Sequence, residues 1–85
     1  MPAYVTGRKE FLVIVTTTPK LLAPSGRGYA FVMTTDADVY IGSSNSVTGT
    51  WMRIPADLGY VDDLTQDAYY ARTLTGSGTV TGWYA

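Results

Sequence analysis

Apolar side chains recur along the chain in short runs, and glycine, proline, aspartate and serine separate these runs. No window carries apolar residues at helical spacing, and the nearest candidates contain β-branched residues or glycine, which lower helix propensity. The pattern therefore predicts an all-β chain with essentially no helix. We expect about eight short strands, over residues 3–6, 9–17, 21–23, 29–35, 39–42, 51–54, 68–73 and 79–84.

The breaks between these strands have the composition of turns. Residues 24–28 form a turn cluster, residues 35–38 predict a short hairpin whose aspartates accept backbone N–H groups, and residues 76–78 predict the last hairpin. Residues 43–50 are polar and predict a long exposed connection at one end of the fold. This spacing suits a small antiparallel β-sandwich or a jelly-roll-like barrel.

Some predicted strands are apolar on both faces. In residues 11–15 the odd-numbered and even-numbered side chains point to opposite sides of a sheet, and all five are apolar. Residues 29–33 share this property. Since a two-layer sandwich usually leaves its outer faces polar, the pattern predicts that another chain covers a second surface. The alternatives are a small closed barrel and loops that fold over the outer face.

The length of 85 residues predicts one β domain over residues 1–85, with no second core. Residues 1–10 could form an N-terminal arm that pairs with a neighbour's sheet, or a first edge strand. A chain of this size buries only about 63% of its unfolded surface. Because it contains no cysteine and no histidine, disulfides and zinc cannot stabilise it. Association with other chains is the remaining means of stabilisation, so we expect a homo-oligomer.

Charge and composition exclude several functions. A net charge of −1 provides no basic surface for nucleic acid. The longest apolar run, residues 11–15, is far too short to span a membrane, so we expect synthesis in the cytoplasm and no membrane partner. Without histidine or cysteine there is no imidazole base and no thiolate nucleophile. We therefore expect no enzyme activity, no catalytic residue and no cofactor.

The best candidate for a metal site is the cluster of Asp62, Asp63 and Asp67, because calcium binds several carboxylates of one flexible loop. The spacing does not match the EF-hand loop. Solvated carboxylates in a turn are the simpler interpretation, so we predict no metal site, although the residues alone leave calcium binding open.

Aromatic and large apolar side chains provide the candidates for an interface, because such residues dominate the energetics of protein interfaces. In the pairs Tyr69/Tyr70 and Trp83/Tyr84 neighbouring side chains point to opposite faces of a strand, so one of each pair should be in the core. Stacking on sugar rings, with Trp51, Tyr60 and the 43–50 connection, is the alternative use of these aromatics. The interface candidates are Tyr4, Phe11, Val13, Trp51, Tyr60, Tyr69, Trp83 and Tyr84.

Between about residue 20 and residue 84, several short segments follow one another in a recognisable order of strands and turns. They are Tyr29 to Met33, Val39-Tyr40-Ile41-Gly42, Val47-Thr48, Ile54-Pro55-Ala56, Tyr70-Ala71-Arg72 and Gly76-Ser77-Gly78-Thr79-Val80. In this order the chain resembles the small all-β virion proteins of tailed bacteriophages, namely capsid decoration proteins, head-fibre bases and related tail-associated domains. Those relatives often place glycine directly after the Pro-Ala step, whereas this chain has Asp57-Leu58-Gly59 there.

This resemblance implies a jelly-roll-like or immunoglobulin-like sandwich on a capsid or tail surface, commonly as a trimer, with no active site. We therefore predict a phage capsid decoration protein on the outside of the virion. It would self-associate, with a homotrimer favoured, and bind the major capsid protein to stabilise the shell. The alternative prediction is a glycan-binding module of a tail or fibre.

Overall fold

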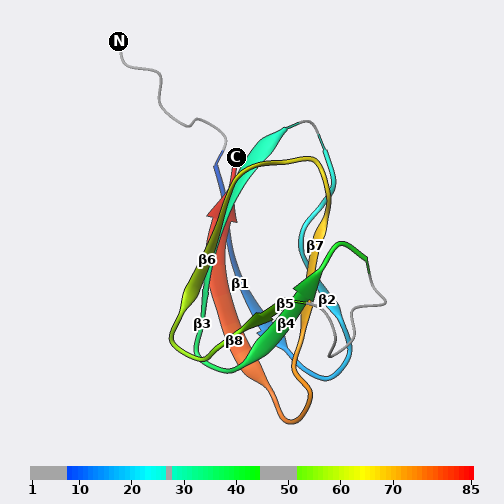
Figure 1. Ribbon diagram of the computed structural model, residues 1–85, viewed down its shortest axis with the longest axis vertical. Coiled ribbons are helices and arrows are strands. Elements are labelled where there is room, and N and C mark those ends of the chain that lie inside the picture. Colours follow the sequence, from blue (N-terminus) through cyan, green and yellow to red (C-terminus); the bar gives the residue numbers. More distant parts are fainter. Residues whose placement is uncertain (1–7, 27, 45–51) are drawn as a thin grey trace.

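The computed structural model describes residues 8–26, 28–44 and 52–85, and this part of the chain is all-β (Figure 1). No helix in it is long and apolar enough to cross a membrane. The strands, in chain order, are β1 (Lys9–Val15), β2 (Lys20–Ala23), β3 (Tyr29–Thr35), β4 (Val39–Gly42), β5 (Met52–Ile54), β6 (Gly59–Thr65), β7 (Tyr69–Arg72) and β8 (Gly78–Tyr84).

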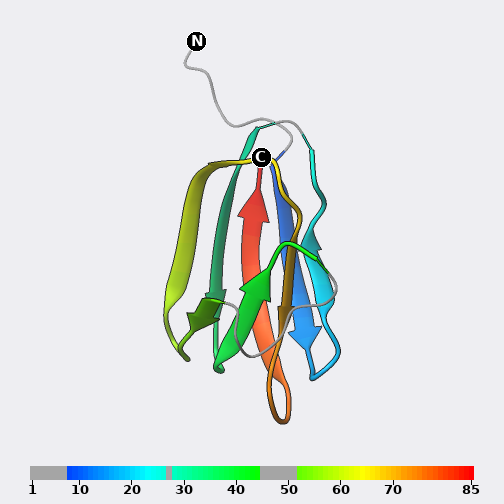
Figure 2. The same ribbon diagram turned by 45° about the vertical axis from the view of Figure 1, so that its right-hand side comes forward.

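The described strands form two antiparallel four-stranded sheets, which make a small β-sandwich (Figure 2). Sheet A has the order β1-β8-β3-β6, and sheet B has the order β2-β7-β4-β5. The pairing is nested, because β1 pairs with β8, β2 with β7, β3 with β6 and β4 with β5. One antiparallel ribbon rolled into two layers gives this order, which is the jelly-roll topology. The predicted fold class is confirmed.

The core lies between the sheets and is built by alternation along the strands. In β3 the side chains of Tyr29, Phe31, Met33 and Thr35 are buried, while the intervening residues face outward. Across the core, the ring of Phe31 stacks on Tyr69 of β7. The buried apolar side chains are Val15, Leu22, Ala23, Tyr29, Phe31, Met33, Val39, Ile41, Ile54, Tyr69, Ala71 and Val80.

The sequence predicted most strands well. The bounds of β3 and β4 are those expected, and the described bounds of β1, β2, β5, β7 and β8 lie within two residues of the prediction. The predicted strand over residues 3–6 lies outside the described residues. Strand β6 was missed, and the placement of Asp62 and Asp63 in a turn is wrong, since both lie within this strand. Two adjacent aspartates are unfavourable for a strand interior, and contacts made in the folded chain, among them the pairing with β3, override that preference.

Two predicted hairpins are also wrong. Residues 35–38 lead from β3 of sheet A to β4 of sheet B, and residues 73–77 lead from β7 of sheet B to β8 of sheet A, which begins at Gly78. In each case the flanking strands belong to different layers and do not pair. A hairpin and a connection between two sheets have similar strand lengths and similar turn residues. The local sequence therefore does not distinguish one kind of connection from the other.

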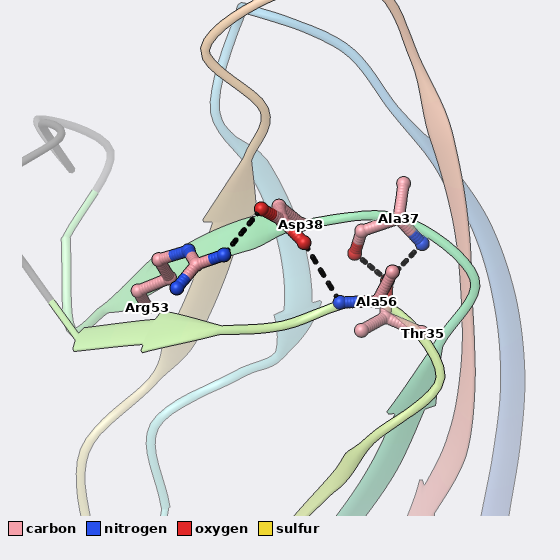
Figure 3. Close-up of polar contacts among 5 residues, drawn as sticks. All are labelled: Thr35, Ala37, Asp38, Arg53 and Ala56. Carbon is pink, nitrogen blue, oxygen red and sulfur yellow. Dashed lines mark hydrogen bonds and ion pairs between the residues drawn. The ribbon is translucent and has the colours of Figure 1, made fainter.

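The aspartates of the 35–38 connection accept backbone N–H groups, as predicted. An oxygen of Asp36 accepts from the N–H of Thr79 at 2.8 Å. Asp38 accepts from the N–H of Ala56 at 2.8 Å and from the guanidinium of Arg53 at 2.6 Å (Figure 3). The bond from Arg53 and then the bond from Ala56 hold the pKa of the Asp38 carboxyl below its usual value. Asp38 thus ties the start of β4 to the chain that leaves β5.

Candidate functional site

The outer face of sheet A exposes an unusual amount of apolar surface. Leu12 and Ile14 of β1 are 65% and 55% exposed, and Val61 of β6 is 60% exposed. The strand register places Trp83 and Val32, both half-buried, in one row with Val61 across the sheet. These five residues define the apolar face. Antiparallel sheets normally have polar outer faces, so this surface is a candidate for contact with another chain.

Polar groups lie between and beside these apolar residues. In the middle of the sheet the hydroxyls of Thr34 and Thr81 are 3.1 Å apart and share a hydrogen bond. At the end where β1 begins, the guanidinium of Arg8 lies 5.3 Å from the ring centre of Trp83 and pairs with Glu10 at 2.7 Å. The apolar face is therefore bordered by a cation–π contact and an ion pair, an arrangement typical of interface rims.

The outer face of sheet B is more polar. Tyr40 and Tyr70 are half-buried there, and Leu21 is 46% exposed. Beside Tyr40 lies an open hollow of about 420 Å³, lined by Ala37, Asp38, Tyr40, Leu74 and Thr75. The two outer faces of the sandwich therefore differ. Leu12, Ile14 and Val61 on sheet A are more exposed than Leu21 on sheet B.

A cluster of tyrosines and one aspartate joins β6 to β7 between the layers. The hydroxyl of Tyr69 donates to the carboxylate of Asp62 and lies 3.2 Å from the hydroxyl of Tyr60. Burial, and then the bonds to Asp62 and Tyr60, raise the pKa of Tyr69 well above its usual value. Close by, Tyr29 donates to the backbone oxygen of Asp67, and burial raises its pKa as well. These contacts fix one edge of sheet A over sheet B.

The acidic residues of this region do not converge on one point. Asp62 faces Tyr69, whereas the next residue, Asp63, is exposed. Among residues 8–26, 28–44 and 52–85, no three acidic side chains lie close enough to hold a metal ion. Calcium binding by Asp62, Asp63 and Asp67 therefore has no geometric support in this structure.

The structure separates the predicted interface residues into three groups. Tyr69 is in the core, and Phe11, Val13, Tyr60 and Tyr84 are partly buried and packed against it. Trp83 lies on the apolar face of sheet A. Tyr4 and Trp51 lie outside the described residues, as does most of the 43–50 connection.

The interface residues predicted from the sequence do not include Leu12, Ile14 and Val61, the most exposed members of the apolar face. The two-sided pattern of residues 11–15 already indicated that Leu12 and Ile14 face away from Phe11 and Val13, and the structure has this arrangement. The apolar pattern of residues 11–15 therefore indicates Leu12 and Ile14, although aromatic residues are the commoner anchors of protein interfaces. The sequence pattern does not point to Val61, because the adjacent Asp62 and Asp63 are typical of a turn.

Comparisons with family models, with curated proteins and with solved structures find no significant match for this chain.

Proposed function

We propose that this chain is a structural binding protein that docks through the apolar face of sheet A, and that it acts as a capsid decoration protein of a tailed bacteriophage. The observation that carries the proposal is the exposure of Leu12, Ile14 and Val61 on one sheet. Removing such side chains from water on binding is favourable by about 25 cal/mol per Å² of apolar surface.

The virion part of the proposal rests on the resemblance over residues 20–84. The jelly-roll strand order supports it as an analogy of fold, because viral capsid domains often have this topology. Lectin domains share the topology as well, so the fold alone does not choose between the two functions.

A decoration protein stabilises a shell by mass action. It binds the assembled major capsid proteins and not the separated subunits, so binding shifts the equilibrium toward the intact shell. A rigid sandwich with an exposed apolar face is sufficient for this function, which needs no active site.

The test uses expanded, undecorated shells assembled from the major capsid protein encoded in the same genome. Wild-type protein should bind these shells and raise the temperature at which they break. The double variant L12S/V61S should lose binding. The matched control is Leu21→Ser, which removes a half-exposed leucine from sheet B and should bind like wild type.

Two outcomes would overturn the proposal. In the first, wild-type protein neither binds the shells nor changes their disruption temperature. In the second, Leu21→Ser weakens binding as much as L12S/V61S, which would show that the apolar face of sheet A has no special part.

A glycan-binding module is the second candidate, and the hollow on sheet B favours it. There an aromatic ring, Tyr40, lies beside the carboxylate of Asp38, and sugars are commonly bound by stacking and polar contacts together. Tyr60, which the sequence suggested for this purpose, instead packs against the core beside Tyr69. A glycan array with wild type and Tyr40→Ala tests this candidate, and equal signals from the two proteins would exclude the hollow.

A further inference from the structure

Strand β1 is at the edge of sheet A, and its backbone groups point alternately inward and outward. Ala30 and Ala85 exchange two backbone hydrogen bonds, of 2.8 and 3.0 Å, at the end of the β3–β8 ladder. In an antiparallel ladder, pairs that exchange backbone hydrogen bonds alternate with pairs that do not. Trp83, two residues before Ala85, therefore also bonds to β3. The backbone groups of the next residue, Tyr84, point the other way and bond to β1.

This alternation fixes the direction of every backbone group in β1. From Tyr84 backward, every second residue of β8 points its backbone groups to β1. The partners of these residues in β1 are Lys9, Phe11, Val13 and Val15. The N–H and C=O groups of Glu10, Leu12 and Ile14 therefore point away from β8. In the described part of the chain, no strand pairs with this side of β1. Three residues thus offer both a donor and an acceptor at the sheet edge.

The other three sheet edges carry features that oppose pairing with a further strand. Strand β6 has an extra residue opposite β3, between Tyr29 and Phe31, and Asp63 is exposed on it. Strand β2 is short and has a register shift after Leu21, and β5 spans only Met52–Ile54. By contrast β1 is long, pairs with β8 without a register shift, contains no proline and carries its charged residues, Lys9 and Glu10, at one end only. Among the four described sheet edges, that of β1 is therefore the one suited to pair with a further strand, and the β1 edge of a second copy is an equally long and regular partner.

We infer that two copies of this chain pair antiparallel through their β1 edges, with Leu12 opposite Leu12 on a two-fold axis. This is the register that overlaps the whole strand Lys9–Val15 with its copy. It places Glu10 opposite Ile14 of the other copy, so like charges do not face each other. The three outward residues of each copy then form about six backbone hydrogen bonds.

The inferred pairing gives a concrete form to the self-association that the sequence predicts, and it has two consequences. It joins two copies of sheet A into one continuous sheet, so Leu12 and Ile14 of both copies lie side by side and the apolar face is doubled. It also gives a two-fold dimer, because a strand paired with its own copy is an isologous contact that closes at two. The trimer implied by the resemblance would need a different contact.

Engineered cysteines test the register, and the absence of native cysteine makes each test unambiguous. In the inferred dimer the two copies of position 12 are about 5.5 Å apart between Cα atoms, which a disulfide can span. The Cα atoms of the two copies of position 14 are about 14 Å apart, because an offset of four residues along the strand adds to the separation between the two strands. Under mild oxidation, Leu12→Cys should form a covalent dimer at least tenfold faster than Ile14→Cys.

A second pair of variants separates backbone pairing from apolar contact. Leu12→Pro removes an outward N–H without removing a bond to β8, and edge strands tolerate proline at such positions. Leu12→Thr removes the apolar side chain and keeps the N–H. Sedimentation equilibrium should show a wild-type dimer with a dissociation constant of about 1–100 µM, as expected for a small interface. Leu12→Pro should be monomeric, and Leu12→Thr should still dimerise. If Leu12→Pro does not fold, the cysteine comparison decides.

Equal disulfide formation at positions 12 and 14 would overturn the inferred register. A wild-type mass of one or three chains at every concentration would overturn the dimer. These results are independent of the shell experiment: protein that stays monomeric and still stabilises shells disproves the β1 pairing and leaves the proposed function intact. Protein that forms the dimer but does not bind shells supports the β1 pairing and disproves the proposed function.

Discussion

Phe31 of β3 and Tyr69 of β7 stack across the two sheets, with ring centres 4.1 Å apart and planes at 13° to each other. Phe31 also stacks on Phe11 of β1, with a centre-to-centre distance of 5.9 Å. One fully buried ring therefore contacts an edge strand of its own sheet and a central strand of the facing sheet. The stability of both layers should depend on it.

We expect Phe31→Ala to lower the free energy of unfolding by about 3–5 kcal/mol, because it removes buried apolar surface and leaves a cavity. Urea denaturation followed by tryptophan fluorescence measures the change. Leu58→Ala is the control, since this leucine is half-exposed in a turn, and it should change stability by no more than about 0.5 kcal/mol. Similar losses in both variants would contradict the placement of Phe31 at the centre of the core.

Stability should fall at alkaline pH because of Tyr69. Burial and its bond to Asp62 raise the pKa of Tyr69 in the folded state, whereas an unfolded tyrosine ionises near pH 10. Its contribution to stability is therefore complete below pH 10 and is lost as the pH rises above that value. Above about pH 10 one such group lowers the free energy of unfolding by about 1.4 kcal/mol per pH unit.

The variant Tyr69→Phe should remove this part of the pH dependence. Some slope should remain, because the pKa of Tyr29 is raised too. At neutral pH the variant should lose about 1–3 kcal/mol, since Asp62 no longer receives its hydrogen bond. Urea denaturation at several values between pH 8 and pH 11.5 gives both quantities. An unchanged alkaline slope in Tyr69→Phe would show that this hydroxyl does not govern the loss.

The sequence predicted the fold class and most strands because segments such as Tyr29–Thr35 are rich in aromatic, β-branched and other apolar residues and are bounded by turn residues. It did not predict β6, where Asp62 and Asp63 break the pattern and contacts with β3 and Tyr69 compensate. It also did not predict which consecutive strands pair. That choice depends on how the whole ribbon rolls into two layers, which no local segment encodes. For the same reason, the position of Val61 beside Val32 could not be predicted.

Close approach of strands requires glycine at position 82. A Cβ atom there would lie 2.8 Å from the Cα of Met33 and 2.9 Å from the ring of Phe11, and closer still to the carbonyl oxygen of Val32. Gly82→Ala should therefore push β8 away from a neighbouring strand and lower stability by about 1–3 kcal/mol. Thermal unfolding with Gly26→Ala as control measures this, because nothing lies within 4 Å of a Cβ at position 26. A neutral Gly82→Ala would mean that the strands are less closely packed than described.

The orientation of β1 underlies both proposals and can be tested directly. Ile14 points outward and is 55% exposed, whereas Val15 is fully buried. Ile14→Thr should change the free energy of unfolding by no more than about 0.5 kcal/mol. Val15→Thr keeps the shape of the side chain but places a hydroxyl in the apolar core, which should cost about 1–3 kcal/mol. Chemical denaturation of the two variants provides the comparison. A slip of β1 by one residue would exchange the two faces of the strand, so the opposite order of effects would exclude the outward position of Leu12 and Ile14.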